Sequence, residues 1–354
     1  MLIHTIKKAL MQGPVSLTRH RIDLISGLVC ALMHVRSVNL RKLACSLPGM
    51  AQIDSHYRRL QRFLSSEVSP GVFTQLIVSK LVRPDQQQLL VMDRTHWKLG
   101  RTDLNVLCVG LVYQGVSIPL EYQSLQKPGN SHTEERKRIL TKVLAYLDPN
   151  SCCLVADREF IGRAWFAFLL KQPVDFVIRL RGNTSLTLDD GRQRYAAAFN
   201  ERMPRGTTRY YPQTSLYGGL ILNLVCHRPL RGERILLITN RTDLKQVLAL
   251  YGQRWSIETT FACLKSRGFN LEDTHLTQPQ RLHLLLGLLA WTMLWALLVG
   301  QQLQQRKPIP IKKHGRKAIS LFRRGLDQLT QIIHQARDQP EIARQYQSIL
   351  LSCT

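Results

Sequence analysis

Two short apolar runs, each followed directly by an aspartate, constrain the fold of this chain most strongly. Residues 88–92 lead into Asp93, and residues 152–156 lead into Asp157. Apolar runs of this length are typical of buried strands. The sequence therefore predicts two core strands that each bring a carboxylate to the end of a sheet.

The segments between these runs predict the topology. Residues 105–113 and 116–122 flank a Gln-Gly pair and predict a hairpin, in which Pro119 favours an edge position for the third strand. A helix to about residue 147 follows and opens at a capping box of Ser131 and Glu134. Three strands, a helix and a fourth strand form the opening of an α/β fold of the RNase H-like type.

In that topology the first and fourth strands are neighbours, so Asp93 and Asp157 meet at one edge of the sheet. Two close carboxylates repel each other, and their pKa values rise unless a cation neutralises them. Mg²⁺ is suited to sites with oxygen ligands only and with phosphate partners. The pair therefore predicts a magnesium site.

The elements after Asp157 continue the mixed pattern. Residues 181–233 are polar, glycine-rich and weakly periodic, with strand-like patches at 208–211 and 220–226, and predict a β-rich insertion. The other expected elements are a helix at 161–171, strands at 174–180 and 235–239, and a long helix that begins at Thr242 or Asp243 and continues through Lys265.

Four polar side chains fall on one stripe of this long helix. On an ideal helix, Tyr251, Arg254, Glu258 and Lys265 lie within an arc of about 60°, over a length of about 21 Å. A stripe of this kind is usually a solvated face with ion pairs along the helix. Together with the two aspartates, it predicts a metal-ligating carboxylate, Glu258, among groups that bind phosphate.

The charge of the chain favours a polyanionic partner. Lys and Arg number 49 against 24 Asp and Glu, for a net charge of +25. Nucleic acid is the first candidate, because cations that neutralise phosphates release condensed counterions; an anionic membrane is the second. The eight cysteines include no Cys-x-x-Cys pair, which gives no support to a zinc site and favours reduced thiols in the cytoplasm.

One uncharged segment competes for a membrane role. Residues 284–300 are 17 residues without a charge, close to the lower limit for a membrane-spanning helix. Two tryptophans lie in the middle of the segment rather than at an interface, and a helix that is apolar all round is equally typical of a protein core. We expect a buried core helix and no membrane partner.

The N-terminal region predicts a helical bundle. Residues 39–47 and 56–64 predict two helices separated by Pro48-Gly49, the second capped by Asp54 or Ser55. The second helix is basic, so helix, turn and basic helix together suggest DNA binding through three arginines: Arg58, Arg59 and Arg62. The alternative is a helical hairpin whose basic face is only solvated.

The four-residue stripe also carries a family resemblance. The spacing Tyr-x2-Arg-x3-Glu-x6-Lys from Tyr251 to Lys265 resembles the signature of bacterial insertion-sequence transposases of the DDE type, in the insertion-sequence-four family. Residues 91–93 and the segment Asp157-Arg-Glu-Phe160 resemble the two acidic motifs of that family, and 176–181 and 237–241 resemble its core strands. The similarity spans roughly residues 80–275.

The resemblance implies catalysis by Asp93, Asp157 and Glu258 with Mg²⁺, for which Mn²⁺ can substitute. It implies cleavage at the ends of an insertion sequence, joining to target DNA, a homodimer on double-stranded DNA and a place in the cytoplasm on the nucleoid. The expected division is a helical DNA-binding region (1–82), a catalytic core (83–180 and 234–300), the insertion (181–233) and a basic helical region (301–354).

Three alternatives remain at this point. The first is a nuclease on the same fold that cuts DNA without strand transfer. The second is a DNA-binding regulator of transposition with a decayed core, against which the three intact acids argue. The third is a basic membrane-associated protein. No aromatic residue is identified that would hold a flipped-out base, and Trp255 is expected to serve in the core or against DNA.

Overall fold

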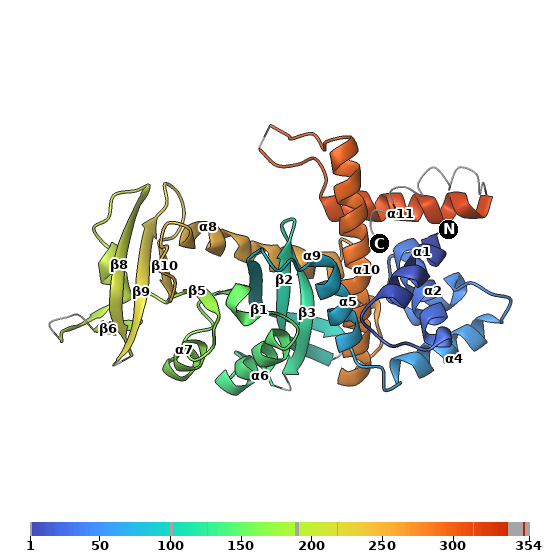
Figure 1. Ribbon diagram of the computed structural model, residues 1–354, viewed down its shortest axis with the longest axis horizontal. Coiled ribbons are helices and arrows are strands. Elements are labelled where there is room, and N and C mark those ends of the chain that lie inside the picture. Colours follow the sequence, from blue (N-terminus) through green and yellow to red (C-terminus); the bar gives the residue numbers. More distant parts are fainter. Residues whose placement is uncertain are drawn as a thin grey trace.

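A large mixed sheet runs through the computed structural model, with helices on both faces and a helical lobe at one end (Figure 1). The structure describes residues 2–99, 102–125, 127–187, 191–217, 219–313, 315–338 and 350. Within these ranges the sheet has ten strands in the order β3-β2-β1-β4-β5-β10-β9-β8-β6-β7.

The first five strands have the expected neighbours. They are β1 (Gln88–Leu99), β2 (Thr102–Tyr113), β3 (Val116–Leu125), β4 (Cys152–Ala156) and β5 (Asp175–Arg179). Strand β1 pairs with β2 in antiparallel and with β4 in parallel orientation, so the first and fourth strands are adjacent as predicted. Strand β3, which contains Pro119, forms one edge of the sheet, as predicted.

In the part that the structure describes, the predicted β-rich insertion contains four strands and a short 3₁₀ helix, η2 (Ala196–Asn200), and the strands extend the same sheet. They are β6 (Ser185–Thr187), β7 (Gln193–Tyr195), β8 (Thr207–Leu216) and β9 (Leu220–Arg228). Strand β10 (Ile235–Thr239) lies between β5 and β9 and is antiparallel to both. The insertion is therefore joined to the core by continuous backbone hydrogen bonds through β10 rather than by a separate linker.

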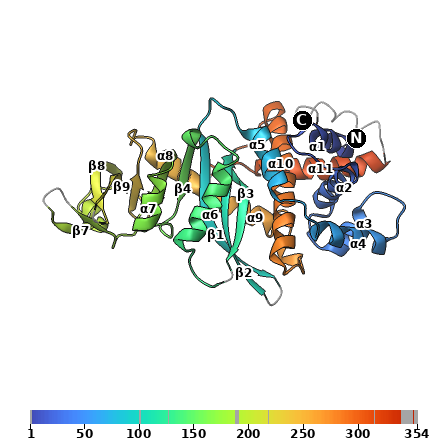
Figure 2. The same cartoon turned by 60° about the horizontal axis from the view of Figure 1, so that its bottom comes forward.

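Helices on both faces make this a three-layer arrangement. Helices α6 (Thr133–Leu144) and α7 (Arg163–Leu169) cover one face, and α8 (Val247–Gly252) and α9 (Ser256–Leu264) cover the other (Figure 2). The capping box of α6 lies one residue later than predicted: Glu135 accepts a hydrogen bond from the backbone N–H of His132. His132, rather than Ser131, is the N-cap because Ser131 uses its hydroxyl and N–H to contact Glu159.

The prediction of one long helix from Thr242 or Asp243 to Lys265 is wrong. Asp243 accepts a hydrogen bond from the N–H of Lys245 in a turn, and the helix begins only at Val247. A 3₁₀ turn, η3 (Gln253–Trp255), then separates α8 from α9 directly after Gly252, and glycine disfavours a helix interior. The three pieces still form one row across the sheet (Figure 1).

The N-terminal region is helical throughout, with α1 (Leu2–Gln12), α2 (Arg19–Val35), α3 (Leu40–Ser46), α4 (Ile53–Leu64) and α5 (Gly71–Leu81). Asn39 caps α3 by accepting from the N–H groups of Arg41 and Lys42. The predicted cap of α4 at Asp54 or Ser55 is wrong, because the helix starts earlier, with Gln52 as N-cap, and Asp54 lies in its first turn.

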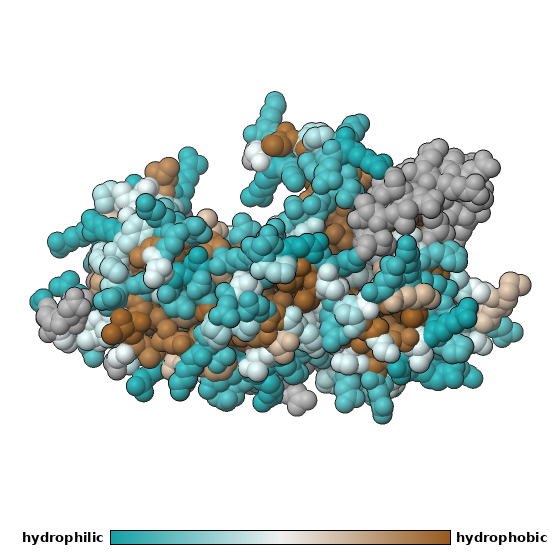
Figure 3. All heavy atoms as spheres, in the orientation of Figure 1, coloured by the Kyte–Doolittle hydropathy of each residue, from teal (hydrophilic) through white to brown (hydrophobic). Residues whose placement is uncertain are grey.

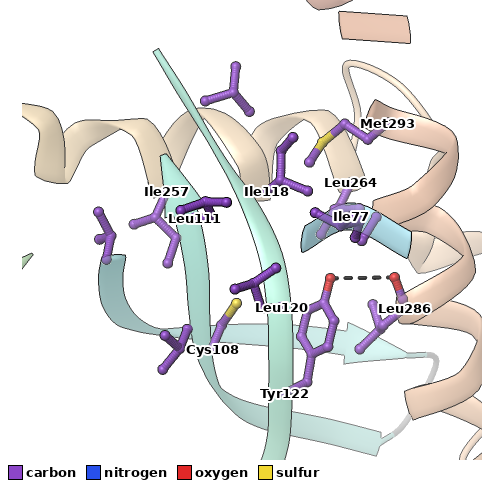
Figure 4. Packing of buried hydrophobic residues seen from close by; sticks show 14 of the residues in the cluster. Ile77, Cys108, Leu111, Ile118, Leu120, Tyr122, Ile257, Leu264, Leu286 and Met293 are labelled. Carbon is purple, nitrogen blue, oxygen red and sulfur yellow. Dashed lines mark hydrogen bonds between the residues drawn. The ribbon is translucent and has the colours of Figure 1, made fainter. Parts of the chain in front are cut away.

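Helix α10 (Pro279–Arg306) is the helix that joins the two parts of the molecule. It packs against β3 on one side and against α2, α5 and α11 (Leu321–Asp338) on others. In Figure 4, Met293 of α10 lies beside Ile77 of α5, Ile118 of β3 and Leu264 of α9, all of them buried. Close to these, the Tyr122 hydroxyl donates to the carbonyl of Leu286 at 3.4 Å.

The apolar segment of α10 is covered by protein. Among the described residues, α10 is the one helix long and apolar enough to cross a membrane, and 89% of its apolar window is buried. This burial agrees with the predicted core helix. Its contact with α11 is close, because a Cβ on Gly325 would overlap the carbonyl oxygen of Ala296.

Candidate active site

The two aspartates lie at equivalent positions on neighbouring parallel strands. Met92 of β1 is paired with Ala156 of β4, and Asp93 and Asp157 are the next residues on each strand. Strand β4 is buried along its whole length, so the backbone that carries Asp157 is fixed by the core. Each carboxylate accepts a hydrogen bond from the N–H of the arginine that follows it, Arg94 at 2.8 Å and Arg158 at 2.7 Å.

The α8–η3–α9 row brings a second set of polar groups to the aspartates. The side chains of Ile257 and Phe261 are buried, and the ring of Phe261 meets Trp97 of β1 edge-on at 6.3 Å between centroids. Thr260 of α9 also accepts from the N–H of Ser117 in β3 at 3.1 Å. These contacts fix α9 on the sheet, one turn of helix from Glu258.

Arg254 connects the two sets. Its Nη1 lies 3.4 Å from Oδ2 of Asp93, and its Nη2 donates to Oε1 of Glu258 at 2.8 Å. The hydroxyl of Tyr251 lies 3.4 Å from Oδ1 of Asp157. Tyr251 is thus in contact with Asp157, and Arg254 connects Asp93 to Glu258. These contacts form although the helix between Tyr251 and Glu258 is not continuous.

The electrostatics follow from burial. Desolvation raises the pKa of Asp93 from 3.8 to about 6, and the charges of Asp157 and Glu159 add to this, whereas the N–H of Arg94 and the charge of Arg254 oppose it. Burial disfavours the charge of Arg254, but the Glu258 hydrogen bond and the nearby Tyr251 and aspartates outweigh it and raise its pKa. Burial and Asp157 also raise the pKa of the Tyr251 phenol.

The donor chemistry fits a hard divalent cation. Asp93, Asp157 and Glu258 supply carboxylate oxygens only, and the raised pKa of Asp93 reflects a buried negative charge that a cation would stabilise. Within the described ranges no three Asp, Glu, His or Cys side chains are already grouped at metal-ligating spacing. Arg254 is the cation that lies between Asp93 and Glu258.

Comparison with known proteins agrees with this arrangement at the level of the domain. The sequence model of the family described as "Transposase DDE domain" matches residues 84–295, well over half of the chain. The chain belongs to this DDE transposase family. DNA transposition is the activity of the family, and its members generally use a divalent metal ion.

The other comparisons add little to the family assignment. A solved structure described as a piggyBac transposase synaptic complex with hairpin DNA is similar, with a TM-score of 0.47 and 12% identity over 99% of this chain and 82% of that chain. No curated protein matches.

In this DDE transposase chain, Lys265 lies apart from the other residues of the predicted stripe. It follows the last residue of α9, with a backbone conformation that is not helical. Its Nζ donates to the carbonyl of His96 at 3.1 Å and lies 3.5 Å from Oε1 of Glu272. The side chain therefore contacts β1 farther along the strand than Asp93.

Trp255 is not a core residue. It is 64% exposed, and the guanidinium carbon of Arg254 lies 5.1 Å from its ring centroid. It is thus a large exposed aromatic ring beside the candidate DDE site.

The three arginines predicted to bind DNA lie in the helical lobe, on α4, and not at the DDE site. Arg58 and Arg62 are exposed and Arg59 is half-buried. Arg59 and Arg62 line a hollow of about 580 Å³ together with His20 and Arg21 from the start of α2. The hollow therefore includes two residues of α2 that the sequence analysis did not single out.

The sequence analysis also missed a polar network behind the aspartates. Glu159 accepts from Nε of Arg94 at 3.1 Å and from the N–H and hydroxyl of Ser131. Arg94 also donates to Asn105 of β2 at 3.0 Å. These bonds tie the segment after Asp157 to β1, directly beside Asp93. The available signal was that Glu159 and Arg94 both adjoin the acidic motifs.

Proposed function

We propose that this protein is a DNA transposase of the insertion-sequence-four type, with an RNase H-like core, which cuts the ends of an insertion sequence and joins them to target DNA. The observation that carries the proposal is the adjacency of Asp93 and Asp157 on parallel strands, beneath a helical row that presents Tyr251, Arg254 and Glu258. The strand order β3-β2-β1-β4-β5 supports the RNase H-like assignment.

Asp93, Asp157 and Glu258 would hold two Mg²⁺ ions. When bound, such ions neutralise charge on the attacking and leaving oxygens of an in-line displacement at a phosphodiester. The fixed strands keep Asp93 and Asp157 in position, and the contacts of α9 with β1 and β3 keep Glu258 over them. Arg254 balances part of the carboxylate charge when the ions are absent.

Arg254 is assigned a second role, to hold a phosphate of the DNA. Its Nε is buried and has no hydrogen-bond partner among the described residues, so a local rearrangement that exposes it would provide a donor for an incoming oxygen. Guanidinium groups bind phosphate through two parallel N–H donors. We assign Tyr251, Lys265 and the exposed ring of Trp255 to contacts with the same DNA strand.

The remaining DNA contacts are assigned to the helical lobe. The hollow that Arg59 and Arg62 share with His20 and Arg21 supports a phosphate-binding surface, with Arg58 exposed on the same helix. We propose that the protein acts as a homodimer that pairs two transposon ends.

The experiment is a cleavage assay on a duplex that carries the end of the element, with variants Asp93→Ala, Asp157→Ala and Glu258→Ala. Each variant is expected to lose Mg²⁺-dependent cleavage and to retain binding in a gel shift. Asp85→Ala is the matched control, because Asp85 is an exposed carboxylate that contacts neither aspartate in the described structure. Full cleavage by any of the three variants would refute the assignment.

A second arm distinguishes transposition from simple cleavage. Pre-cleaved ends with free 3′-hydroxyl groups are mixed with a circular target and the wild-type protein. Joined products are expected for a transposase. Cleavage of intact ends without any joining would favour the nuclease instead.

A further inference from the structure

The segment between α10 and α11 forms a projecting basic hairpin, which we call the basic finger (residues 307–313 and 315–318). Ile311 and Lys317 form an antiparallel bridge, and Lys312 donates its N–H to the carbonyl of Arg316 at 2.8 Å. Gly315 adopts φ +79°, the left-handed conformation that such a tight turn needs, and donates to the carbonyl of Lys312. These hydrogen bonds make the finger a hairpin turn rather than a flexible linker.

The base of the finger is fixed to both helices. The side chain of Ile309 is buried, and its N–H donates to Oε1 of Gln304 on α10 at 2.9 Å. On the other side, Nη1 of Arg324 from α11 donates to the carbonyl of Lys307 at 2.6 Å. The hairpin therefore projects from a rigid corner between two helices (Figure 1).

Three lysines of the finger have no acidic partner among the described residues. The chain contains no Asp or Glu between Asp273 and Asp327. Lys312, Lys313 and Lys317 are exposed, and none of the ion pairs of the described residues involves them. Uncompensated cations on a projecting element raise the local positive potential and attract a polyanion.

The composition of the finger favours nucleic acid over an anionic membrane, the two polyanionic partners considered for the whole chain. A membrane-bound segment needs an apolar face that enters the lipid. Ile311, which is 71% exposed, is the large apolar side chain on the surface of this hairpin. One such side chain does not provide an apolar face that could enter a lipid bilayer. A duplex requires only cations at the spacing of phosphates, which a hairpin can lay along a groove.

The finger also stands on the same side of the molecule as the α8–α9 row. In Figure 3 it stands clear of the body at the upper edge, and an open concave stretch of surface separates it from the lobe formed by β8 and β9. In Figure 1 the floor of that stretch is the α8–η3–α9 row. A duplex that reaches the candidate active site from this side meets the side of the molecule from which the finger projects.

We propose that the basic finger binds the phosphate backbone of the transposon-end duplex. This DNA contact is separate from the arginines of α4 and from the candidate active site. The inference rests on the proposed function for the identity of the duplex. Its chemistry depends only on a polyanion with regularly spaced phosphates, so it can be tested by binding alone.

The test measures binding of a fluorescein-labelled duplex copied from the end of the element, by anisotropy, over a series of salt concentrations. The variant combines Lys312→Ala, Lys313→Ala and Lys317→Ala. Each lost phosphate contact should lower the slope of log K against log salt by about 0.9. Three lost contacts would make the fall in affinity between 50 and 200 mM salt about 40-fold smaller than for the wild type.

The matched control removes the same charge elsewhere, with Lys8→Ala on α1, Arg138→Ala on α6 and Lys171→Ala just after α7, where all three cations are exposed. The control should keep the wild-type slope. Lysine-to-arginine replacement at the three finger positions should also keep it. An equal change of slope in the finger variant and the control would show only an effect of net charge, and would overturn the proposal.

A further arm tests the commitment to the transposon end. Wild-type and finger-variant proteins are first loaded with the end duplex and then titrated with a second, differently labelled duplex. If the end duplex binds normally while only capture of the second duplex fails, the finger contacts target DNA and the proposal is wrong. If duplex binding depends on the finger but the protein never cleaves DNA, the proposed function is refuted. The finger then remains a contact for duplex DNA.

Discussion

Replacement of Asp93 by asparagine should stabilise the metal-free protein at neutral pH. The pKa of Asp93 is raised to about 6 in the folded chain, mainly because burial disfavours its charge. In the unfolded chain the group returns to its ordinary value, 3.8. The folded state therefore binds this proton more tightly, and the free energy of unfolding falls as pH rises from about 4 to about 6.

The size of the effect follows from the shift. A difference of about two pKa units, at 1.36 kcal/mol each, corresponds to at most about 3 kcal/mol of destabilisation, complete above pH 6. The asparagine side chain has no charge to desolvate, and Arg254 keeps its pairing with Glu258 in that variant. Asp93→Asn should thus unfold at higher denaturant concentration than the wild type at pH 8, and the two should converge near pH 4.

The assay is urea unfolding in EDTA at several pH values, with Asp85→Asn as the control. Asp85 is exposed, so its replacement removes the same charge without relieving burial. Added Mg²⁺ should stabilise the wild type more than Asp93→Asn, because a ligand that binds only the folded state raises the free energy of unfolding. Equal stability of Asp93→Asn and the wild type at pH 8, or a difference that does not change with pH, would refute the reasoning.

Four further outcomes are expected. In single-turnover cleavage against Mg²⁺ concentration, Glu258→Gln should lose activity at every concentration. Arg254→Ala should lose a charge-assisted hydrogen bond worth about 1.5–3 kcal/mol but should need the same Mg²⁺ concentration as the wild type. A change in the Mg²⁺ concentration needed would mean that Arg254 acts by positioning Glu258. Gly325→Ala should destabilise the protein by about 1–3 kcal/mol in thermal unfolding, because its Cβ would overlap Ala296, and unchanged stability would contradict the close helix contact. Replacement of Arg58, Arg59 and Arg62 on α4 by alanine should lower the slope of log K against log salt for DNA binding by about 0.9 per lost phosphate contact. An unchanged slope would mean that these side chains are only solvated.

The sheet topology could be predicted from the sequence because its signals are local. The run that ends at Asp93, the Gln-Gly turn and the run that ends at Asp157 each define a strand or a turn without reference to distant residues. Pro119 marked the edge for an equally local reason, since it cannot donate a ladder hydrogen bond. The long β1 and β2 strands exceed their apolar runs because pairing with each other continues past the polar residues.

The sequence singled out side chains that the structure brings together, but it did not predict how they are arranged. Helical periodicity placed Tyr251, Arg254 and Glu258 together, and the structure links them to the aspartates, although by a broken helix. Periodicity could not show that Arg254 pairs with Asp93, because that contact joins residues 161 positions apart. The same holds for Glu159, whose partners Arg94 and Ser131 lie on other elements.

Lys265 and Trp255 show the limits of the helical wheel. The wheel assumes that the helix continues, whereas α9 ends before Lys265 and the 3₁₀ turn at Trp255 rotates the side chains that follow it. Exposure of Trp255 depends on which elements lie above the turn, and no sequence pattern gives that information.

The position of α10 has a consequence for how this chain folds during synthesis. Helices α2, α4 and α5 bury their apolar faces against α10 and α11, and Arg36 at the end of α2 pairs with Asp327 of α11 at 2.7 Å. These helices leave the ribosome before the surface that completes their core is translated. They must remain incompletely packed while the whole sheet is translated, and such exposed apolar faces are aggregation-prone. Chains truncated before α10 should therefore lose the helical lobe as well as the missing segment.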